Sequence, residues 1–275
     1  GYKGNPMTSK TSSITTHDGL TLMTREWECA DPKAHVLIVH GLGEHSGRWE
    51  HVGGFLAGRG YASLSFDQRG HGASGGRRTH VESFDEYLDD VELVFSSFSE
   101  ELPRIIYGHS MGGLISTLYA ESDRPQADMY VLSAPAIDAE VPALLRAATS
   151  VLGRLTPRLA LPNSINGEQL SRDPLVGERY FADPLIETKV TTSFGLAMMA
   201  AMPAARSRLA DLEKPILVIH GADDPLVPPQ ASAPLAAVPS VERKLFPGLR
   251  HEIHNEPEHD EVLGFVADWL DAQLA

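Results

Sequence analysis

Cysteine is almost absent from this chain of 275 residues, in which Cys29 is the only one. A single cysteine excludes an intramolecular disulfide and a zinc site built from several cysteines. We expect Cys29 to be a buried, apolar-like residue on an early strand. No apolar run approaches the ~20 residues that a membrane-spanning helix requires. The first residues, GYKGNPMTSK, lack the apolar stretch of a signal peptide. These absences favour a cytoplasmic protein.

Basic residues are also scarce, because 23 Lys and Arg face 37 Asp and Glu, which gives a net charge of -14. A nucleic-acid partner would require basic patches to meet its phosphates, so the composition argues against one. The same charge disfavours simple electrostatic docking on anionic lipid. The hydrophobic share of 42% is ordinary for a globular protein. The length suits one large α/β domain or two smaller ones.

Apolar runs alternate with helical patterns along most of the chain. Two early strands are expected near residues 12–16 and 20–28, and the later runs lie at 35–40, 61–66, 104–109, 129–134, 215–220 and 242–246. The helical patterns lie near 49–59, 84–98, 111–122 and 259–274. Continuous apolar runs are typical of parallel strands covered on both faces. The alternation therefore predicts a doubly wound α/β sheet, whose functional site forms at the carboxyl ends of the strands.

The interval from 135 to 214 breaks this rhythm, since it contains no convincing strand. A structureless loop of that length is implausible in a compact domain. We therefore interpret residues 137–209 as a helical cap inserted over the strand ends, between core segments 1–136 and 210–275. Within it, ALLRAATSVLGRL (143–155) has an amphipathic helical pattern. Its apolar face, which includes Leu144 and Leu145, either packs on the domain, lines an acyl tunnel or meets a lipid surface.

A serine lies between the run that ends at His109 and the helical pattern that begins at Met111. The pattern Gly108-His109-Ser110-Met111-Gly112 fits G-x-S-x-G, in which a sharp strand-to-helix turn exposes the serine hydroxyl. The two glycines are needed because larger side chains would clash at so tight a turn. A glycine-flanked serine is also common in ordinary turns. The nucleophile hypothesis therefore depends on finding a base, an acid and an oxyanion hole.

Acid and base candidates follow other strands of the predicted sheet. Asp223 and Asp224 follow one apolar run, Asp138 follows another, and His251 precedes the last helix. The order of serine, acid and histidine is that of an α/β-hydrolase. His251 would take the proton of Ser110, and the aspartate would fix the imidazole tautomer. The residues alone leave the choice among the three aspartates open.

Two backbone amides are candidates for an oxyanion hole. Met111 follows the serine at the start of its helix, and Leu42 lies between Gly41 and Gly43 after an early strand. The glycines also suggest a dinucleotide-binding loop, G-x-G-x-x-G. That alternative fails because Ser46 occupies the position of the third glycine.

The histidine-rich segment HEIHNEPEH (251–259) invites a metal interpretation, but its spacing is not that of H-E-x-x-H. We expect no metal and no organic cofactor. The segment FDQRGHGASGG (66–76) is interpreted as an ordered structural loop.

The segments HGLGEHSGRW, FDQRGHGASGG, GHSMGG, LSAPA, GADDPLV and FPGLRHEIHNEP together resemble the monoacylglycerol lipases, serine hydrolases of the α/β-hydrolase fold. The resemblance covers nearly the whole chain and is weakest in the insertion. It implies a mostly parallel, doubly wound sheet of eight strands with a helical cap. It also implies Asp224 as the acid beside Ser110 and His251, Leu42 and Met111 as oxyanion donors, and Glu44, Arg48 and His254 as glycerol-binding residues. A purely structural ion pair between Glu44 and Arg48 is the alternative.

The implied reaction is the hydrolysis of a monoacylglycerol to fatty acid and glycerol through an acyl-enzyme on Ser110. A lysophospholipase or a broad carboxylesterase could use the same residues, because the insertion sets substrate choice. A catalytically silent binding protein on the same fold is the non-enzyme alternative, and it predicts that a triad member is lost. Peripheral contact with a membrane or micelle through the cap is a further expectation, and the sequence does not indicate an oligomeric state.

Overall fold

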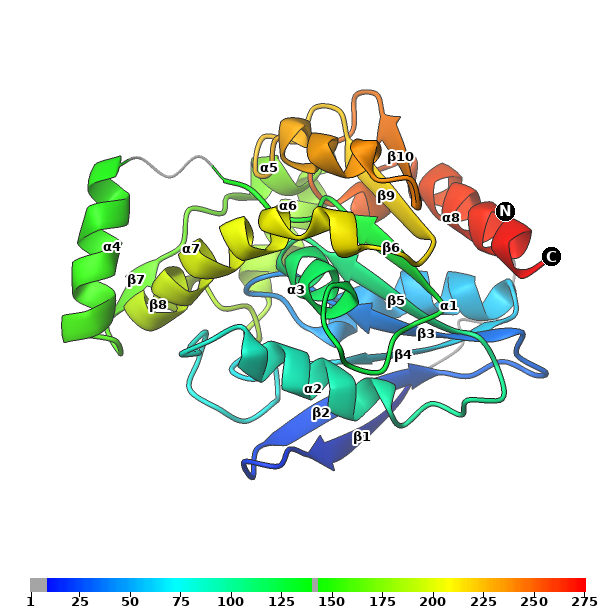
Figure 1. Cartoon of the computed structure of the whole chain (residues 1–275), viewed down its shortest axis with the longest axis horizontal. Coiled ribbons are helices and arrows are strands. Elements are labelled where there is room, and N and C mark those ends of the chain that lie inside the picture. Colours follow the sequence, from blue (N-terminus) through cyan, green and yellow to red (C-terminus); the bar gives the residue numbers. More distant parts are fainter. Residues whose placement is uncertain (1–8, 140–142) are drawn as a thin grey trace.

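The computed structural model describes residues 9–139 and 143–275 and contains one large sheet with helices on both sides (Figure 1). The sheet order is β1-β2-β4-β3-β5-β6-β9-β10. The strands are β1 (Lys10–Thr15), β2 (Thr21–Trp27), β3 (Ala34–Val39), β4 (Tyr61–Phe66), β5 (Arg104–His109), β6 (Met129–Ser133), β9 (Ile216–Gly221) and β10 (Val241–Phe246). Strand β2 is antiparallel to β1 and β4, and every other neighbouring pair is parallel. The predicted mostly parallel, eight-stranded α/β-hydrolase sheet is confirmed.

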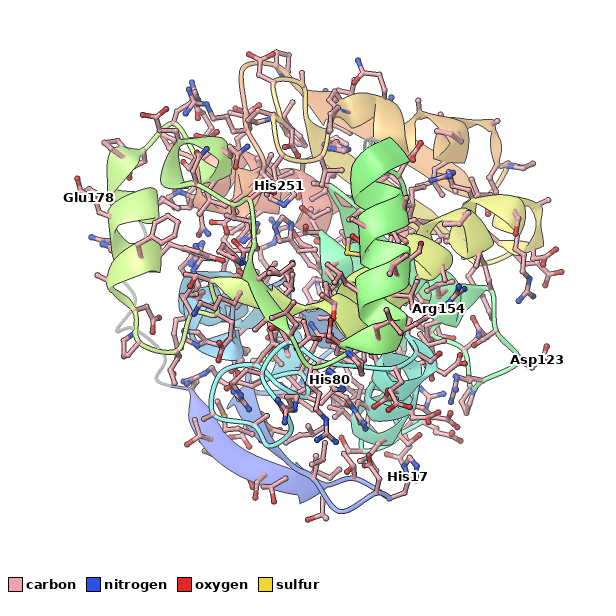
Figure 2. The ribbon with its side chains drawn as sticks, turned by 90° about the vertical axis from the view of Figure 1, so that its left-hand side faces the viewer. His17, His80, Asp123, Arg154, Glu178 and His251 are labelled. Atoms are coloured by element: carbon pink, nitrogen blue, oxygen red, sulfur yellow. The ribbon has the colours of Figure 1, made fainter. Side chains whose placement is uncertain are left out.

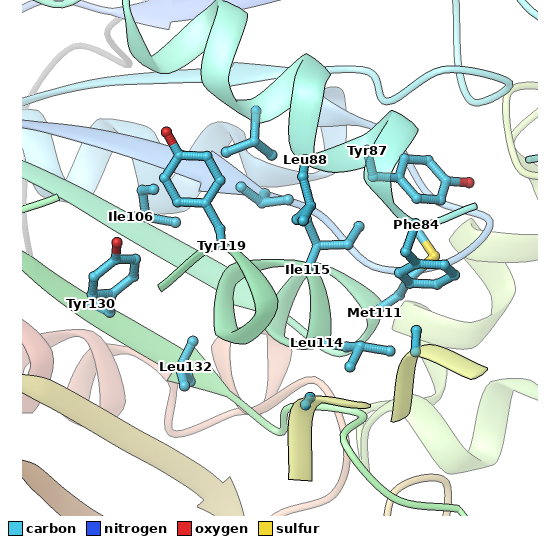
Figure 3. Packing of buried hydrophobic residues seen from close by; sticks show 14 of the residues in the cluster. Phe84, Tyr87, Leu88, Ile106, Met111, Leu114, Ile115, Tyr119, Tyr130 and Leu132 are labelled. Atoms are coloured by element: carbon cyan, nitrogen blue, oxygen red, sulfur yellow. The ribbon is translucent and has the colours of Figure 1, made fainter. Parts of the chain in front are cut away.

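Five helices cover the two faces of this sheet. Helices α1 (Glu50–Gly58) and α8 (His259–Leu274) lie on one face, and α2 (Asp85–Phe95), α3 (Met111–Ala120) and α7 (Thr192–Ser207) lie on the other. Successive strand residues point to opposite faces. In β5, for example, Ile105 and Tyr107 pack with α1 and α8, whereas Ile106 packs with α2 and α3 (Figure 3). Because both faces are covered here, the central strands β3, β5, β6 and β9 are almost entirely buried.

The interval from 135 to 214 contains more than helices. It holds α4 (Ala143–Leu155), α5 (Gly167–Leu170), α6 (Pro174–Ala182) and α7, and also a short antiparallel pair, β7 (Ala160–Pro162) and β8 (Lys189–Thr191). The expectation that it lacks strands is therefore wrong, because strands of three residues are too short to produce a visible pattern. The division of the chain into a core (1–136 and 210–275) and a cap (137–209) stays a prediction.

Helix α4 lies at the edge of the molecule and packs on α7 (Figure 1). The two helices approach closely at Gly153, where a Cβ atom would lie only 2.9 Å from the carbonyl oxygen of Thr192. Val151 and Leu155 are exposed, which leaves part of the predicted apolar face unburied. The side chains of Leu144 and Leu145 lie outside the described part of the structure.

The described residues also form 3₁₀ segments at Ser46–Trp49, Leu209–Asp211, Pro229–Ala237 and Ile253–Asn255. Cys29 follows the end of β2 and is partly exposed, so the expectation of a buried strand residue is wrong. Within residues 9–139 and 143–275, no helix combines the length and the apolar character that crossing a membrane requires.

Candidate active site

Ser110 occupies the sharp turn between β5 and α3. Its backbone adopts φ 54° and ψ −116°, a strained conformation for a residue other than glycine. A Cβ atom on Gly108 would lie 2.2 Å from Ser116 Oγ, and one on Gly112 would lie 2.0 Å from the carbonyl oxygen of Val39. The prediction that both flanking positions require glycine is confirmed. The turn presents the Ser110 hydroxyl at the carboxyl end of the sheet.

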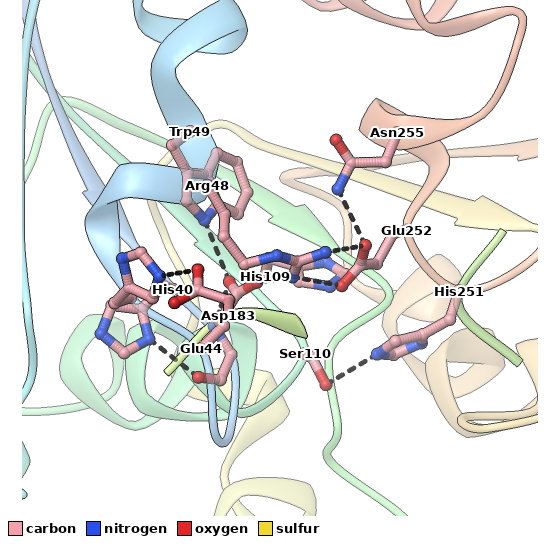
Figure 4. Close-up of polar contacts among 12 residues, drawn as sticks. His40, Glu44, Arg48, Trp49, His109, Ser110, Asp183, His251, Glu252 and Asn255 are labelled. Atoms are coloured by element: carbon pink, nitrogen blue, oxygen red, sulfur yellow. Dashed lines mark hydrogen bonds and ion pairs between the residues drawn. The ribbon is translucent and has the colours of Figure 1, made fainter. Parts of the chain in front are cut away.

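The structure brings the three predicted catalytic residues into one hydrogen-bonded row. Ser110 Oγ lies 2.9 Å from His251 Nε2, and His251 Nδ1 lies 2.7 Å from Asp224 Oδ2 (Figure 4 shows the first contact). A carboxylate only accepts hydrogen bonds, so Nδ1 carries the proton and Nε2 is free to accept the proton of Ser110. The arrangement is that of a nucleophile, a general base and an orienting acid.

The competing aspartates are placed elsewhere. Asp223 is exposed, and Asp138 forms an ion pair with Arg206 at 2.6 Å. Asp224 is buried, and its second oxygen accepts the backbone amides of residues 226 and 227 at 2.8 and 2.9 Å. His220, which the sequence analysis did not single out, also lies against Asp224, at 3.2 Å. These bonds hold the carboxylate in place beside His251.

The charge of Asp224 sets the protonation of the row. Burial alone would lower the pKa of His251, but the charge and hydrogen bond of Asp224 outweigh burial and raise it. Two further carboxylates, Glu252 and Glu44, act in the same direction. For Asp224, burial would raise the pKa, but His251 and His220 hold it well below its usual range. The carboxylate is therefore ionised wherever the imidazole works as a base.

The two predicted oxyanion donors are the backbone amides of Met111, which directly follows Ser110, and of Leu42. Met111 is the first residue of α3, where backbone N–H groups have no partner within the helix. Leu42 lines the same cavity as Ser110. Among the described residues, neither amide has a hydrogen-bond partner in the protein. Both are free to receive an oxyanion, and their role stays a prediction.

Glu44 and Arg48 are both engaged within the protein. Arg48 Nη1 lies 2.5 Å from Glu44, and the guanidinium forms two parallel bonds of 2.7 Å to Glu252 (Figure 4). Glu44 Oε1 also accepts the amide of Gly41 and the indole N–H of Trp49, both at 2.9 Å. All of these groups are largely buried. This arrangement favours the structural alternative that the sequence analysis left open.

His254 is fully buried and does not line the cavity around Ser110. Its ring stacks on Trp49 with centroids 4.2 Å apart, and it meets the His109 ring edge-on. Neither ring nitrogen has a hydrogen-bond partner in the described part of the chain. Burial holds its pKa well below the ordinary value. His254 therefore packs behind the cavity, and its contact with glycerol stays a prediction.

The cavity at Ser110 has a volume of about 20 Å³, which is room for about one water molecule. Beside Ser110, His251 and Leu42, it is lined by Ile165, Leu170 and Tyr180 from the interval between β6 and β9. The Tyr180 ring lies over the Arg48 guanidinium at 4.8 Å, and its buried hydroxyl has no partner among the described residues. A buried hydroxyl without a partner is available to a ligand that reaches it.

Sequence reasoning missed Glu252, Tyr180 and Leu170. Glu252 was visible as the residue after His251, but nothing in the sequence showed that Arg48 would reach it. Tyr180 and Leu170 come from the segment whose sequence is least informative. In the part of the chain that the structure describes, no group of three or more His, Cys, Asp or Glu residues could hold a metal ion.

Comparison with known proteins agrees with this architecture. The profile described as "Serine aminopeptidase, S33" matches residues 30–258. A monoacylglycerol lipase of Mycolicibacterium smegmatis is 36% identical over 253 residues, which are 89% of this chain and 90% of that protein. The human monoglyceride lipase is 31% identical over 271 residues, covering 94% and 89% of the two chains. The crystal structure of Paleococcus ferrophilus monoacylglycerol lipase is 30% identical, with a TM-score of 0.81 over 96% of this chain and 98% of that one. The chain therefore belongs to the serine aminopeptidase S33 family and is a serine hydrolase with the α/β-hydrolase fold.

Proposed function

We propose that this chain hydrolyses monoacylglycerols to fatty acid and glycerol through an acyl-enzyme on Ser110. The observation that carries the proposal is the hydrogen-bonded row of Ser110, His251 and Asp224, which opens on a cavity beside two free backbone amides. Ser110 Oγ attacks the ester carbonyl carbon while His251 Nε2 takes its proton. The amides of Leu42 and Met111 bind the oxyanion.

Collapse of this tetrahedral adduct breaks the bond to glycerol. His251 gives its proton to the leaving glycerol oxygen, and the acyl group stays on Ser110. A water molecule then loses a proton to His251 and attacks the acyl carbon, which releases the fatty acid and restores the Ser110 hydroxyl. Asp224 keeps His251 in the productive tautomer and stabilises the imidazolium in both halves of the cycle.

An ester substrate suits the charges of the cavity better than a peptide with a free amino terminus. An aminopeptidase must hold the ammonium group of its substrate, which requires an available carboxylate. The two carboxylates that line the cavity, Glu44 and Glu252, are already bonded to Arg48. The unpaired hydroxyl of Tyr180 offers a neutral partner that suits a glycerol hydroxyl. The names of the relatives point to the same substrate class.

The cavity must widen before a monoacylglycerol can enter, because about 20 Å³ cannot hold an acyl chain. Residues 165–172 are bonded to the loop after β10, where the amide of Glu252 donates to the carbonyl oxygen of Leu170 at 2.8 Å and Ser171 donates to Glu256. Residues 174–187 have few polar contacts with the core. His45 Nε2 lies 2.7 Å from Asp183, and the amide of Glu187 donates to the carbonyl oxygen of Gly43 at 2.8 Å. We infer that residues 174–187 move away to admit substrate, while residues 165–172 stay on the loop after β10.

A lipid surface is the proposed peripheral partner of the cap. Every large hydrophobic residue that is exposed in the described part of the chain lies between 151 and 185: Val151, Leu155, Leu159, Leu161, Leu175, Phe181 and Leu185. Figure 2 views the molecule from this side, where α4 lies in front of the body. An exposed apolar surface of this kind is typical of a contact with a membrane or another protein. A lipid surface fits the proposed substrate.

Substitution of the nucleophile tests the proposal most directly. Ser110→Ala should lower kcat on a monoacylglycerol by several orders of magnitude while the melting temperature changes little, because only the nucleophilic oxygen is lost. A fluorophosphonate probe should label the wild-type protein at Ser110 and leave Ser110→Ala unlabelled. Labelling of another residue, or an active Ser110→Ala protein, would refute the mechanism.

Substrate choice requires a second measurement on the wild-type protein. Initial rates should be compared for monoacylglycerols, lysophosphatidylcholine and p-nitrophenyl esters that carry the same acyl chain. The proposal expects the highest kcat/KM among the natural lipids for monoacylglycerol. A higher value for lysophosphatidylcholine would make the chain a lysophospholipase. Comparable values on all of them would make it a broad carboxylesterase.

A further inference from the structure

The imidazole of His40 is held in one tautomer. His40 follows β3 and is fully buried. Its Nδ1 lies 2.8 Å from the carbonyl oxygen of Gly41, and its Nε2 lies 3.0 Å from the amide nitrogen of Gln68. A carbonyl oxygen only accepts and an amide N–H only donates, so Nδ1 carries the proton and Nε2 carries none. Burial also lowers the pKa of His40, which keeps the ring neutral.

The hydrogen bond from His40 fixes the direction of the Leu42 amide. The carbonyl oxygen of Gly41 and the N–H of Leu42 belong to one planar trans peptide unit, so they point in opposite directions. The carbonyl points at the buried ring of His40. The N–H therefore points away from that ring, and Leu42 and Ser110 line the same cavity. Gly41 itself lies against the nucleophile, because a Cβ atom on it would be 3.2 Å from Ser110 Cβ.

Two further side chains hold this loop. The amide of Gly41 donates to Glu44 Oε1, which fixes the preceding peptide unit as well. Gln68 Nε2 donates to the carbonyl oxygen of His40 at 2.6 Å, so Gln68 holds His40 through both a backbone and a side-chain bond. Gln68 belongs to the segment FDQRGHGASGG, which the sequence analysis interpreted as a structural loop. The contact connects that loop to the vicinity of Ser110.

We propose that His40 is a positioning residue for the oxyanion hole, which directs the N–H of Leu42 toward the oxyanion formed on Ser110. This inference rests on the proposed function, in which Leu42 is an oxyanion donor. A donor that bonds the oxyanion acts more strongly in the transition state than on the bound ester. Loss of the His40 bond therefore lowers kcat and leaves KM nearly unchanged.

Two substitutions separate the two ring nitrogens of His40. The side-chain amide of Asn can place an N–H where Nδ1 lies, so His40→Asn keeps a donor for the Gly41 carbonyl. The longer side chain of Gln reaches the position of Nε2, so His40→Gln removes that donor. We expect His40→Gln to lower kcat on p-nitrophenyl butyrate by roughly 10- to 100-fold, less than the loss from deleting a whole oxyanion donor. His40→Asn should retain most of the activity.

His71 provides a matched control. It is also fully buried, its ring lies 5.5 Å from that of His40, and its Nδ1 donates to the carbonyl oxygen of Arg69 at 3.0 Å. No hydrogen bond joins it to the loop from Gly41 to Gly43 among the described residues. His71→Gln should therefore cost a similar loss of melting temperature to His40→Gln, but kcat of its folded fraction should stay near the wild-type value.

The inhibition constant of a trifluoromethyl ketone distinguishes positioning of the oxyanion hole from a merely structural role, which would leave this constant unchanged. The ketone adds to Ser110 and places an oxyanion in the hole, so its inhibition constant should rise in His40→Gln by about the factor by which kcat falls. Equal losses in His40→Asn and His40→Gln, equal losses in His71→Gln, or unchanged inhibition would overturn the role of His40. Failure of the proposed function looks different: the wild-type protein itself would neither cleave the ester nor bind the ketone.

Discussion

Asp224 shows how buried hydrogen bonds select one acid among three candidates. Its carboxylate accepts from His251, and two backbone amides hold it in place. Asp224→Asn should lower kcat by about four orders of magnitude, because an amide favours the wrong histidine tautomer. Asp223→Asn and Asp138→Asn are the controls, and both should stay within a few-fold of the wild-type kcat. If Asp138→Asn proves the crippling change, the acid follows β6 and not β9.

The raised pKa of His251 predicts the acid side of the pH–rate profile. His251 must be neutral to accept the proton of Ser110, so kcat/KM falls as the pH drops through its pKa. Since Asp224, Glu252 and Glu44 together raise that pKa, half of the activity should be lost at a pH above 6.5, the ordinary value for histidine. A profile that stays flat well below that pH would contradict this assignment.

Glu252 offers a separate test of the same electrostatics. Glu252→Gln removes a negative charge that stabilises the imidazolium, so the acid limb of kcat/KM should move to lower pH. Glu256→Gln is the matched control, because Glu256 is also a buried carboxylate but is bonded to Ser171, Arg172 and the amide of Arg250 and not to Arg48. An equal displacement of the limb in both variants would show that the effect is general and not local to Glu252.

At the residue scale, the sequence predicted the side chains that stand directly after strands. Ser110, Asp224 and His251 could be found because each follows a recognisable apolar run. The partner of Arg48 could not, because the pairing with Glu252 joins residues that are far apart in the chain. From the sequence alone, the neighbouring Glu44 was the predicted partner of Arg48. The fold brings a second carboxylate, that of Glu252, to Arg48, so that the arginine bonds two acids.

Helix α3 carries a buried acid at its end. Glu121 caps the helix, is buried, and neither carboxylate oxygen has a partner in the described part of the chain. Burial raises its pKa to about 8, with Arg208 opposing. The folded protein therefore keeps the proton between about pH 4.5 and pH 8, whereas the unfolded chain has lost it. Unfolding releases a proton in this window, so stability falls as the pH rises.

Glu121→Gln should remove this pH dependence, because the amide is neutral at every pH. The variant should gain melting temperature relative to the wild-type protein between pH 5 and pH 8, with the largest gain at pH 8. Asp123→Asn is the control, because Asp123 is exposed near the same helix end (Figure 2). A difference between Glu121→Gln and wild type that stays constant with pH would show that Glu121 is not protonated in the folded state.

At the element scale, periodicity predicted the core and failed in the insertion. The core strands β3, β4, β5, β6 and β9 follow from apolar runs, and helix α8 follows from a helical repeat of apolar residues. Strands β7 and β8 have three residues each, and their side chains are mostly exposed, so no alternation of burial marks them in the sequence. Helix α4 was visible because it is amphipathic. What its apolar face contacts depends on α7, which no local pattern reveals.

Charge is distributed unevenly over the whole molecule. The net charge is -14, yet the segment from Val141 to Gly167 contains three arginines and no acidic residue. The exposed Val151 and Leu155 lie in the same segment. A basic and apolar surface suits an anionic lipid surface even when the rest of the protein is acidic, because electrostatic attraction acts over about one Debye length. The proposed contact with lipid would therefore form through residues 141–167.

Replacement of the exposed apolar residues of α4 tests the proposed contact with lipid. Burying a large aliphatic side chain contributes roughly 1.5–3 kcal/mol, so Val151→Ser with Leu155→Ser should weaken binding to anionic vesicles by at least about tenfold. Turnover of aggregated long-chain monoacylglycerol should fall with it, whereas hydrolysis of a water-soluble butyrate ester should not change, because Ser110 is untouched. Ala148→Ser, at another exposed position of α4, is the control.

Vesicle co-sedimentation and the two rates separate three outcomes. Loss of both activities together with the melting temperature would make these residues structural, and unchanged binding would remove α4 from the lipid contact. Loss of vesicle binding and of long-chain turnover alone would place the opening of the cap at the membrane.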